Sequence, residues 1–277
     1  MSLNSFRPPY KPPGISKMLS SGPQPQNHAD RLVLVQQLSD KLQLLYPDQV
    51  VAIALYGSMA RQQDGPYSDI EMLCIVAEPD LDVSFEWVYG AGKAEINVLG
   101  RNDARWEAKE VPSDWAISKG AFLDAQLIYG DKSCLAELKG LVLSISEDEA
   151  NKVIGQAIVD ELYEWVGKAR NTLHAGKYSG LPSLACQFAE TIALLLGLAH
   201  RTRYTTGMTL LDESIQFADL PAGYQELCDL VRSGNLSDPQ KTAATIEAAW
   251  SGFVTWATAR GVQIKSGPWP FLPNDVP

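Results

Sequence analysis

Histidine, cysteine and basic residues are scarce in this chain of 277 residues. It contains three histidines and four cysteines, and Lys and Arg together number 23 against 33 Asp and Glu. The cysteines lie far apart without a Cys-x-x-Cys pair, which excludes a zinc ribbon and predicts reduced thiols. Because the histidines are isolated, they do not indicate a zinc site or a histidine base. The net charge of −10 disfavours a nucleic acid partner, which most of the surface would repel.

Long apolar segments are also lacking. The apolar stretch 184–198 is interrupted by Gln187, Glu190 and Thr191, and we expect it to be too short to cross a bilayer. The N-terminal segment is rich in proline and has no apolar core of a secretion signal. We therefore expect no membrane partner, a cytoplasmic location, and a flexible extension over residues 1–29.

A strand followed by glycine and serine is the most informative local feature. The run Val50–Leu55 is apolar and rich in β-branched residues, as is typical of a buried strand. Gly57 and Ser58 follow it, where a backbone without side chains can approach a ligand. A helix that begins there would direct free N–H groups toward a phosphate. The segment predicts a phosphate-binding turn.

Three carboxylates accompany this turn. Asp69 and Glu71 are two residues apart on an expected strand, so they share one face while Ile70 and Met72 point into the core. Two adjacent carboxylates repel each other unless a cation lies between them, and Mg²⁺ prefers such oxygen ligands. Glu95 lies on the polar face of another expected strand, which makes a second ion possible and predicts a two-metal displacement of phosphate.

The pattern of apolar residues divides the chain into a mixed half and a helical half. The fold class is therefore α+β, with a domain at 30–147 and a helical domain at 148–277. In the first half we expect a helix and three strands, at 30–46, 50–56, 69–77 and 93–99. In the second half we expect helices at 151–174, 182–202, 207–217, 221–233 and 237–261.

Charged residues line one face of the expected helix 151–174. Glu161, Glu164 and Lys168 are spaced by three and four residues, so they lie on the same face. From the residues alone, a solvated face with an ion pair between Glu164 and Lys168 explains this spacing as well as a functional site does.

The sequence of residues 56–71, YGSMARQQDGPYSDIE, is similar to a motif of the nucleotidyltransferase superfamily that includes DNA polymerase β. Over its full length it resembles the aminoglycoside 4′-nucleotidyltransferases of the kanamycin nucleotidyltransferase type. Residues 158–171 resemble the family helix that carries the general base. Shorter similarities occur at 181–184, 204–206, 219–224 and 233–238, so the resemblance covers roughly residues 31–262.

The resemblance implies a nucleotidyltransferase domain, with a mixed sheet flanked by helices, and a C-terminal helical bundle that carries the base. It also implies a role for each candidate residue. Glu164 would be the general base and Lys168 would contact the nucleotide phosphates. The other implied sets are Gly57, Ser58, Arg61 and Ser68 for the nucleotide, Asp69, Glu71 and Glu95 for Mg²⁺, and Glu86, Asp160, Glu161 and Glu164 for the ammonium groups of the drug.

The activity that this resemblance implies is transfer of AMP from Mg·ATP to the 4′-hydroxyl of drugs such as kanamycin, tobramycin and amikacin. Glu164 would deprotonate the hydroxyl for in-line attack, pyrophosphate would leave, and the bacterium would become resistant. The base and the metal carboxylates belong to different halves of the chain. The resemblance implies a homodimer in which the partner subunit supplies the base and the lysine.

Two alternatives stay open. One is a nucleotidyltransferase with another acceptor, such as a lincosamide, a nucleic acid end or a protein hydroxyl. The acidic composition disfavours the nucleic acid, and the Glu164 helix favours a sugar hydroxyl. The other alternative is a nucleotide-binding or antitoxin-type module without turnover, which a missing carboxylate or base would favour.

Overall fold

The computed structural model describes residues 22–267, and these divide into two compact units. The first unit contains the described residues up to Ala108 together with Gly120–Val142. The second contains Lys109–Lys119 and the described residues from Leu143 onward. The sequence pattern did not predict that the short stretch 109–119 groups with the helical unit.

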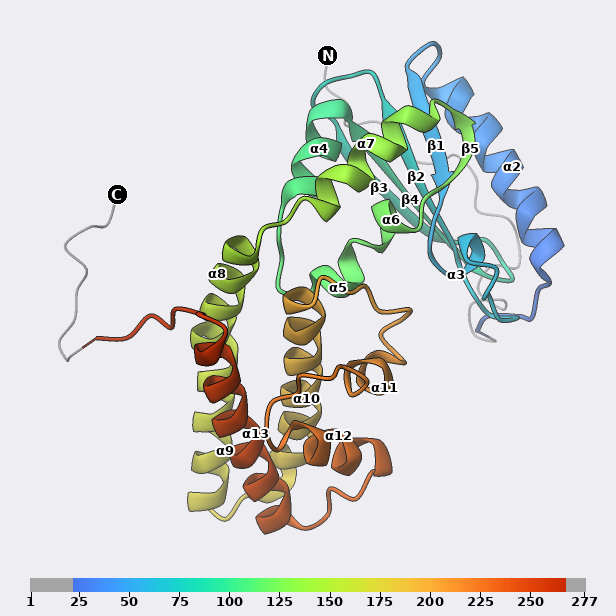
Figure 1. Ribbon diagram of the computed structural model, residues 1–277. Coiled ribbons are helices and arrows are strands. Elements are labelled where there is room, and N and C mark those ends of the chain that lie inside the picture. The colour runs from blue at the N-terminus through green and yellow to red at the C-terminus, as the bar shows by residue number, and fades with distance from the viewer. Residues whose placement is uncertain (1–21, 268–277) are drawn as a thin grey trace. The chain divides into compact units, whose positions relative to one another are not determined.

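The first unit is built on a five-stranded sheet with the strand order β3-β4-β2-β1-β5 (Figure 1). Strands β2 and β4 are parallel, and the other neighbouring pairs are antiparallel. The expected mixed sheet is thus confirmed. The strands are β1 (Val50–Leu55), β2 (Ile70–Val76), β3 (Asp82–Val88), β4 (Lys93–Gly100) and β5 (Gln126–Gly130). The helices are α2 (His28–Leu45), α3 (Gly57–Ala60), α4 (Arg101–Lys109), α6 (Gly120–Leu123) and α7 (Lys132–Leu143).

The three strands expected from the sequence are present, whereas β3 and β5 were missed. Both missed strands are the edges of the sheet and have mostly exposed or half-buried residues. The segment Asp82–Val88 nevertheless alternates polar and apolar residues, so its period of two was a usable signal. Trp87 and Tyr89 are partly buried and pack against the apolar cluster of the sheet, whereas Phe85 is exposed.

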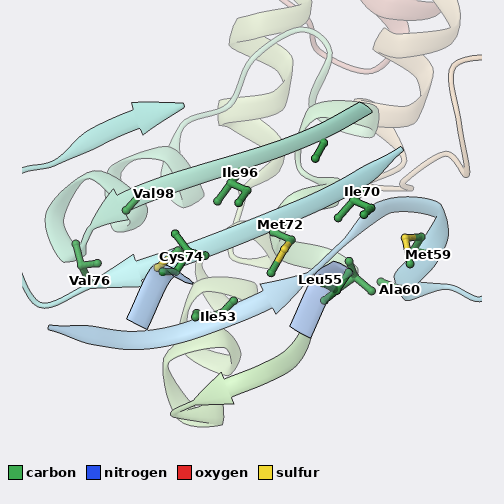
Figure 2. Close-up of a cluster of buried hydrophobic side chains, with 13 residues drawn as sticks. Ile53, Leu55, Met59, Ala60, Ile70, Met72, Cys74, Val76, Ile96 and Val98 are labelled. Atoms are coloured by element: carbon green, nitrogen blue, oxygen red, sulfur yellow. The ribbon is translucent and has the colours of Figure 1, made fainter. Parts of the chain in front are cut away.

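The two faces of the sheet have different neighbours. Ile53 and Leu55 of β1 join a buried cluster with Met72 and Cys74 of β2, on the face that α2 covers (Figure 2). The intervening residues of β1 are alanines that pack with Leu135 of α7 on the other face. Because side chains alternate along a strand, Glu71 points away from the large apolar cluster. The carboxylates therefore lie on the face opposite to α2.

Helix α2 begins at His28, two residues before the expected start, because the side chain of Asn27 caps it by accepting a hydrogen bond from Asp30 N. The apolar stripe of this helix, Leu34, Leu38, Leu42 and Leu45, coincides only in part with its buried face. The buried residues are Arg31, Val35, Ser39 and Leu42, while Leu34 and Leu38 are half-buried and pack against the core cluster. A polar residue at each of two inner positions hid the true stripe.

The described part of the proline-rich extension is held in place. Gln24 N donates to Ala91 O at 2.8 Å, and Gln26 N donates to Pro66 O at 2.8 Å. The Tyr89 hydroxyl donates to Gln26 Oε1 at 2.7 Å. Residues 24 and 26 of the extension expected over residues 1–29 therefore contact the first unit, and residues 1–21 lie outside the described part.

The second unit is helical, as expected. Its elements are α5 (Trp115–Ser118), α8 (Glu147–Ala157), η1 (Ile158–Leu162), α9 (Tyr163–His174), η2 (Tyr178–Gly180), α10 (Leu181–Ala199), α11 (Leu210–Ser214), α12 (Tyr224–Ser233) and α13 (Pro239–Ala259). Ser146 and Glu149 form a capping box at the start of α8. Between α8 and α9, η1 is one π-helical turn, so the expected helix 151–174 is continuous but locally wide.

Helix α10 is the most apolar helix expected from the sequence. Together with the preceding turn it spans 22 residues, Tyr178–Ala199, which is long and apolar enough to cross a membrane by composition alone. The helix is thus longer than the apolar stretch 184–198 that the sequence pattern outlined. In its most apolar window 61% of the residues are buried inside the protein, as in the core helix of a helical bundle.

Candidate active site

The turn after β1 needs a glycine for two separate reasons. Gly57 has φ of +68°, a conformation that side chains disfavour. A Cβ atom at this position would also lie 1.7 Å from Glu71 Oε2, so the carboxylate occupies the space of the missing side chain. The helix that follows, α3, is a single turn of four residues. A helix thus begins at the turn as expected, and because it is so short, the N–H groups of the local backbone are what it can offer to a phosphate.

Three glutamates stand side by side across the sheet. Glu71 of β2 is in register with Glu95 of β4, and Glu95 is in register with Glu86 of β3. Asp69 precedes Glu71 by two residues and so belongs to the same face. The alternation expected from the sequence thus brings together the three candidate metal ligands and one of the candidate substrate ligands in a row, here called the carboxylate row (Asp69, Glu71, Glu95 and Glu86).

Burial and the neighbouring charges of the carboxylate row raise the pKa of Glu71. Burial, followed by repulsion from Asp69 and Glu95, raises this pKa to about 7. A bound cation would remove the repulsion, which is the behaviour of a set of oxygen ligands suited to Mg²⁺. Over residues 22–267, however, no three His, Cys, Asp or Glu side chains are close enough to enclose a metal ion as placed. The donor chemistry fits a metal, and closing the ligands around it would need side-chain movement.

Two uncharged side chains hold Glu95. The Tyr56 hydroxyl donates to Glu95 Oε1 at 3.1 Å, and Asn97 Nδ2 donates to the same oxygen at 3.0 Å. Asn97 Nδ2 also lies 3.1 Å from the Tyr56 hydroxyl oxygen. Tyr56 is 6% exposed, and burial together with Glu95 and Glu71 raises the pKa of its hydroxyl, which stays protonated. Neither residue was expected to have a role in the site.

A lysine lies between two members of the carboxylate row. Lys93 Nζ is 2.5 Å from Glu86 Oε1 and 3.8 Å from Glu95 Oε2. The side chains of Lys93 and Glu86 are 42% and 59% exposed, so this end of the row faces solvent. The structure therefore contains one example of an ammonium group bound by these carboxylates.

Arg61 was expected to bind the triphosphate, and here it forms an ion pair with Asp124. The side chains of the pair are 19% and 12% exposed. The guanidinium partly opposes the rise in the pKa of Glu71, because it places positive charge near the carboxylate row. For Arg61 to contact a nucleotide, it would have to share its donors with Asp124, a residue that the sequence analysis did not single out.

The loop between the turn and Asp69 is fixed by a buried arginine. Arg31 is 1% exposed and pairs with Asp64 through Nη2. Its guanidinium also donates to the carbonyl oxygens of Gly65 at 2.8 Å and Pro66 at 3.2 Å. Ser68, expected to bind the nucleotide, uses its hydroxyl to accept a hydrogen bond from Gly65 N at 3.0 Å. In this structure Ser68 therefore stabilises the loop.

The expected base and lysine form an ion pair on α9. Lys168 Nζ lies 2.7 Å from Glu164 Oε1, and the side chains are 53% and 58% exposed. Both groups are thus accessible to a substrate. An exposed ion pair at this spacing contributes only about 0.3–0.5 kcal/mol to stability, so this pair has little effect on the stability of the fold.

Two acidic residues, Asp160 and Glu161, lie within the π-turn η1 that precedes this pair. Asp160 Oδ2 accepts a hydrogen bond from Gln156 Nε2 at 2.6 Å. Glu161 is half-buried, and burial, Asp160 and Asp114 all raise its pKa, although a hydrogen bond from Thr191 opposes the shift. Asp160 and Glu161 form an acidic patch within the helical unit, and Asp114 adds a third negative charge that the sequence analysis missed.

Some of the missed residues had a signal in the sequence. Lys93 and Asn97 each lie two positions from Glu95 on the same strand, so the period of two that identified Glu95 also marked them. Tyr56 immediately precedes Gly57 and was quoted only as part of the motif. Arg31 and Asp124 had no such signal, because their partners are far away in the sequence.

Comparison with known proteins identifies relatives of this chain. Residues 132–263 match the family described as the KNTase C-terminal domain. Two proteins named aminoglycoside nucleotidyltransferase (4′), from a Bacillus species and from Staphylococcus aureus, are each 37% identical to this chain over 241 residues, 87% of this chain and 95% of the relative. A solved nucleotidyltransferase-like protein from Exiguobacterium sibiricum aligns with 82% of this chain and 75% of its own, at 12% identity and a TM-score of 0.46.

The relatives place this chain among the nucleotidyltransferases. More narrowly, the chain belongs to the aminoglycoside nucleotidyltransferase (4′) family, because the identity extends over most of both sequences.

Proposed function

We propose that this protein transfers AMP from Mg·ATP to the 4′-hydroxyl of aminoglycoside antibiotics and thereby confers resistance to them. The observation that carries the proposal is the carboxylate row beside Gly57, in which Glu71 has a raised pKa and Glu86 and Glu95 flank an ammonium group. Such a row suits both a metal-bound triphosphate and a polycationic acceptor. Family membership supports the same reaction.

Each part of the reaction has a group in the chain. Asp69, Glu71 and Glu95 would hold Mg²⁺, as one ion or two. When bound, the metal would neutralise charge on the α-phosphate and on the departing pyrophosphate. Glu164 would take the proton from the acceptor hydroxyl as its oxygen attacks phosphorus, the P–O bond to pyrophosphate would break, and Lys168 would contact the phosphate oxygens.

Phosphate contacts also come from the first unit. We propose that Gly57 and Ser58 donate backbone N–H groups to the triphosphate. We also propose that Arg61 keeps one hydrogen bond to Asp124 and donates another to a phosphate oxygen. A guanidinium can donate five hydrogen bonds, so it can serve both partners. Ser68 would act through the shape of its loop.

The acceptor would be held by its ammonium groups. Glu86 already binds the Lys93 ammonium at 2.5 Å, and we propose that an ammonium group of the drug takes a similar place. Asp160 and Glu161 would bind further ammonium groups, since burial and nearby acids disfavour the ionised form of Glu161 until a cation arrives. The accessible Glu164 would then meet the 4′-hydroxyl.

The proposal requires the carboxylate row and Glu164 to act on the same pair of substrates. We propose a homodimer in which the base and Lys168 act with the carboxylate row of the partner subunit, in keeping with the family resemblance. The bacterial cytoplasm supplies ATP and contains the ribosome that these drugs target, which makes it the compartment we propose.

The test is Mg²⁺-dependent release of pyrophosphate from ATP with kanamycin, tobramycin, lincomycin or no acceptor. We expect release with the two aminoglycosides alone, and its loss with a kanamycin analogue that lacks the 4′-hydroxyl. Mass spectrometry should then show one added adenylyl group on the drug. Glu164→Gln and Asp69→Asn should each reduce the rate by about 100-fold or more.

The matched control is Glu247→Gln. Glu247 is also a glutamate in an ion pair of the helical unit, with Arg170 Nε at 2.7 Å and with its side chain 36% exposed, so its loss should leave the rate unchanged. Release of pyrophosphate with lincomycin alone would show that the reaction is nucleotidyl transfer but that the acceptor is a lincosamide. Tight Mg·ATP binding without release for any acceptor would refute the enzyme and favour a nucleotide-binding module.

A further inference from the structure

Glu95 is the most constrained member of the carboxylate row. Its Oε1 atom accepts two hydrogen bonds, from the Tyr56 hydroxyl at 3.1 Å and from Asn97 Nδ2 at 3.0 Å. Its other oxygen, Oε2, is 3.8 Å from Lys93 Nζ and faces the exposed lysine. One oxygen is thus held by uncharged donors, and the other is left for a cation.

Tyr56 also connects Glu95 to the neighbouring metal candidate. Its backbone N–H donates to Glu71 O at 3.0 Å, while its side chain reaches Glu95. Glu71 and Glu95 are paired residues of parallel strands. One buried residue therefore fixes the backbone of the first carboxylate and the side chain of the second.

Such donors restrict the Glu95 side chain before a metal binds, so the side chain loses less conformational entropy when the metal does bind. A carboxylate with free rotation pays side-chain entropy when a metal fixes it, whereas one already held by two hydrogen bonds does not. Uncharged donors do this without cancelling the negative charge that attracts the cation. Loss of partners of this type commonly lowers metal affinity by about 10- to 100-fold.

We propose that Tyr56 and Asn97 are positioning residues that hold Glu95 in the orientation that binds the divalent cation. This inference rests on the proposed function, in which Glu95 is a metal ligand. Neither residue touches the nucleotide or the acceptor in this scheme. Their effect passes through one oxygen atom of Glu95.

The experiment measures Mn²⁺ binding to the full chain by the electron paramagnetic resonance signal of the free ion, without nucleotide or drug. Tyr56→Phe and Asn97→Ala should each weaken Mn²⁺ binding by about 10-fold. Tyr129→Phe is the matched control, because Tyr129 is a 45% exposed tyrosine of the same sheet, and it should leave binding unchanged.

A double-mutant cycle separates positioning from general damage to the fold. In a Glu95→Gln background, Tyr56→Phe should have almost no further effect on Mn²⁺ affinity, because the ligand that it orients is already lost. A similar 10-fold loss in both backgrounds would overturn the inference. Thermal unfolding of the metal-free variants shows whether each remains folded.

The same data distinguish the two possible failures. If Glu95→Gln weakens binding while Tyr56→Phe and Asn97→Ala do not, the positioning role is wrong and the metal role of Glu95 stands. If Glu95→Gln binds Mn²⁺ as tightly as the natural chain does, the metal role is wrong and the inference falls with it. Pyrophosphate release with kanamycin tests the proposed reaction separately.

Discussion

Replacing Arg31 with methionine should destabilise the first unit strongly. Arg31 and Asp64 form an ion pair whose side chains are 1% and 3% exposed, and the guanidinium also binds the carbonyl oxygens of Gly65 and Pro66. Methionine fills a similar volume but donates no hydrogen bond. The substitution therefore leaves a buried carboxylate and two carbonyl groups without their main donor.

The magnitude follows from the burial of this pair. Removing one partner of a buried ion pair costs about 3–5 kcal/mol, because the remaining charge has no compensation. For a protein of this size, 1 kcal/mol corresponds to about 2–4 °C in Tm. Arg31→Met should thus lower the melting temperature of the first unit by roughly 6–20 °C. His28 Nδ1, 2.7 Å from Asp64 Oδ1, limits the loss but cannot reach the carbonyl groups.

The assay is urea unfolding at pH 7, followed by tryptophan fluorescence, with the double variant Arg31→Met/Asp64→Asn beside the single one. The second substitution removes the stranded charge, so it should restore part of the lost stability. A loss below about 1 kcal/mol for Arg31→Met, the range of an exposed pair, would refute the argument from burial.

The pH dependence gives a second check on the same pair. Burial tends to raise the pKa of Asp64, but hydrogen bonds from Arg31 and His28 outweigh it and hold this pKa below its ordinary value. The stabilisation is then complete above the unfolded pKa of about 3.9 and is lost as pH falls through the lower folded value. The difference between the natural chain and Arg31→Met should therefore shrink in acid.

Three further predictions concern the site itself. Gly57→Ala should lower the free energy of unfolding by about 1–2 kcal/mol because of the positive φ, and it should displace Glu71 and so abolish Mn²⁺ binding. The control is Gly65→Ala, whose Cβ meets nothing within 4 Å and which should change neither stability nor Mn²⁺ binding. Because the pKa of Glu71 is about 7 and a metal binds the ionised form, calorimetry in two buffers should detect proton release on Mn²⁺ binding at pH 6 and little at pH 8.5; release that does not change with pH would contradict this. Glu164→Gln should change the free energy of unfolding, measured in urea, by less than about 0.5 kcal/mol, so a large loss of stability would show that this pair is structural.

Local patterns explain what the sequence predicted correctly. Strands β1 and β2 have apolar runs next to a Gly-Ser turn and an Asp-x-Glu, so their pairing and the placing of Glu71 followed from period and spacing. Arg31 was missed because its partner is a loop residue more than thirty positions away. The width of the π-turn at Ile158–Leu162 was missed because packing within the helical unit determines it and composition does not.

The contact between Gly57 and Glu71 has a consequence for how such a site evolves. The Glu71 carboxylate occupies the volume where any other residue at position 57 would carry its first side-chain carbon. Any other residue at position 57 therefore requires the Glu71 carboxylate to move from the place that it has here. Among relatives in which Glu71 keeps this position, we expect position 57 to remain glycine.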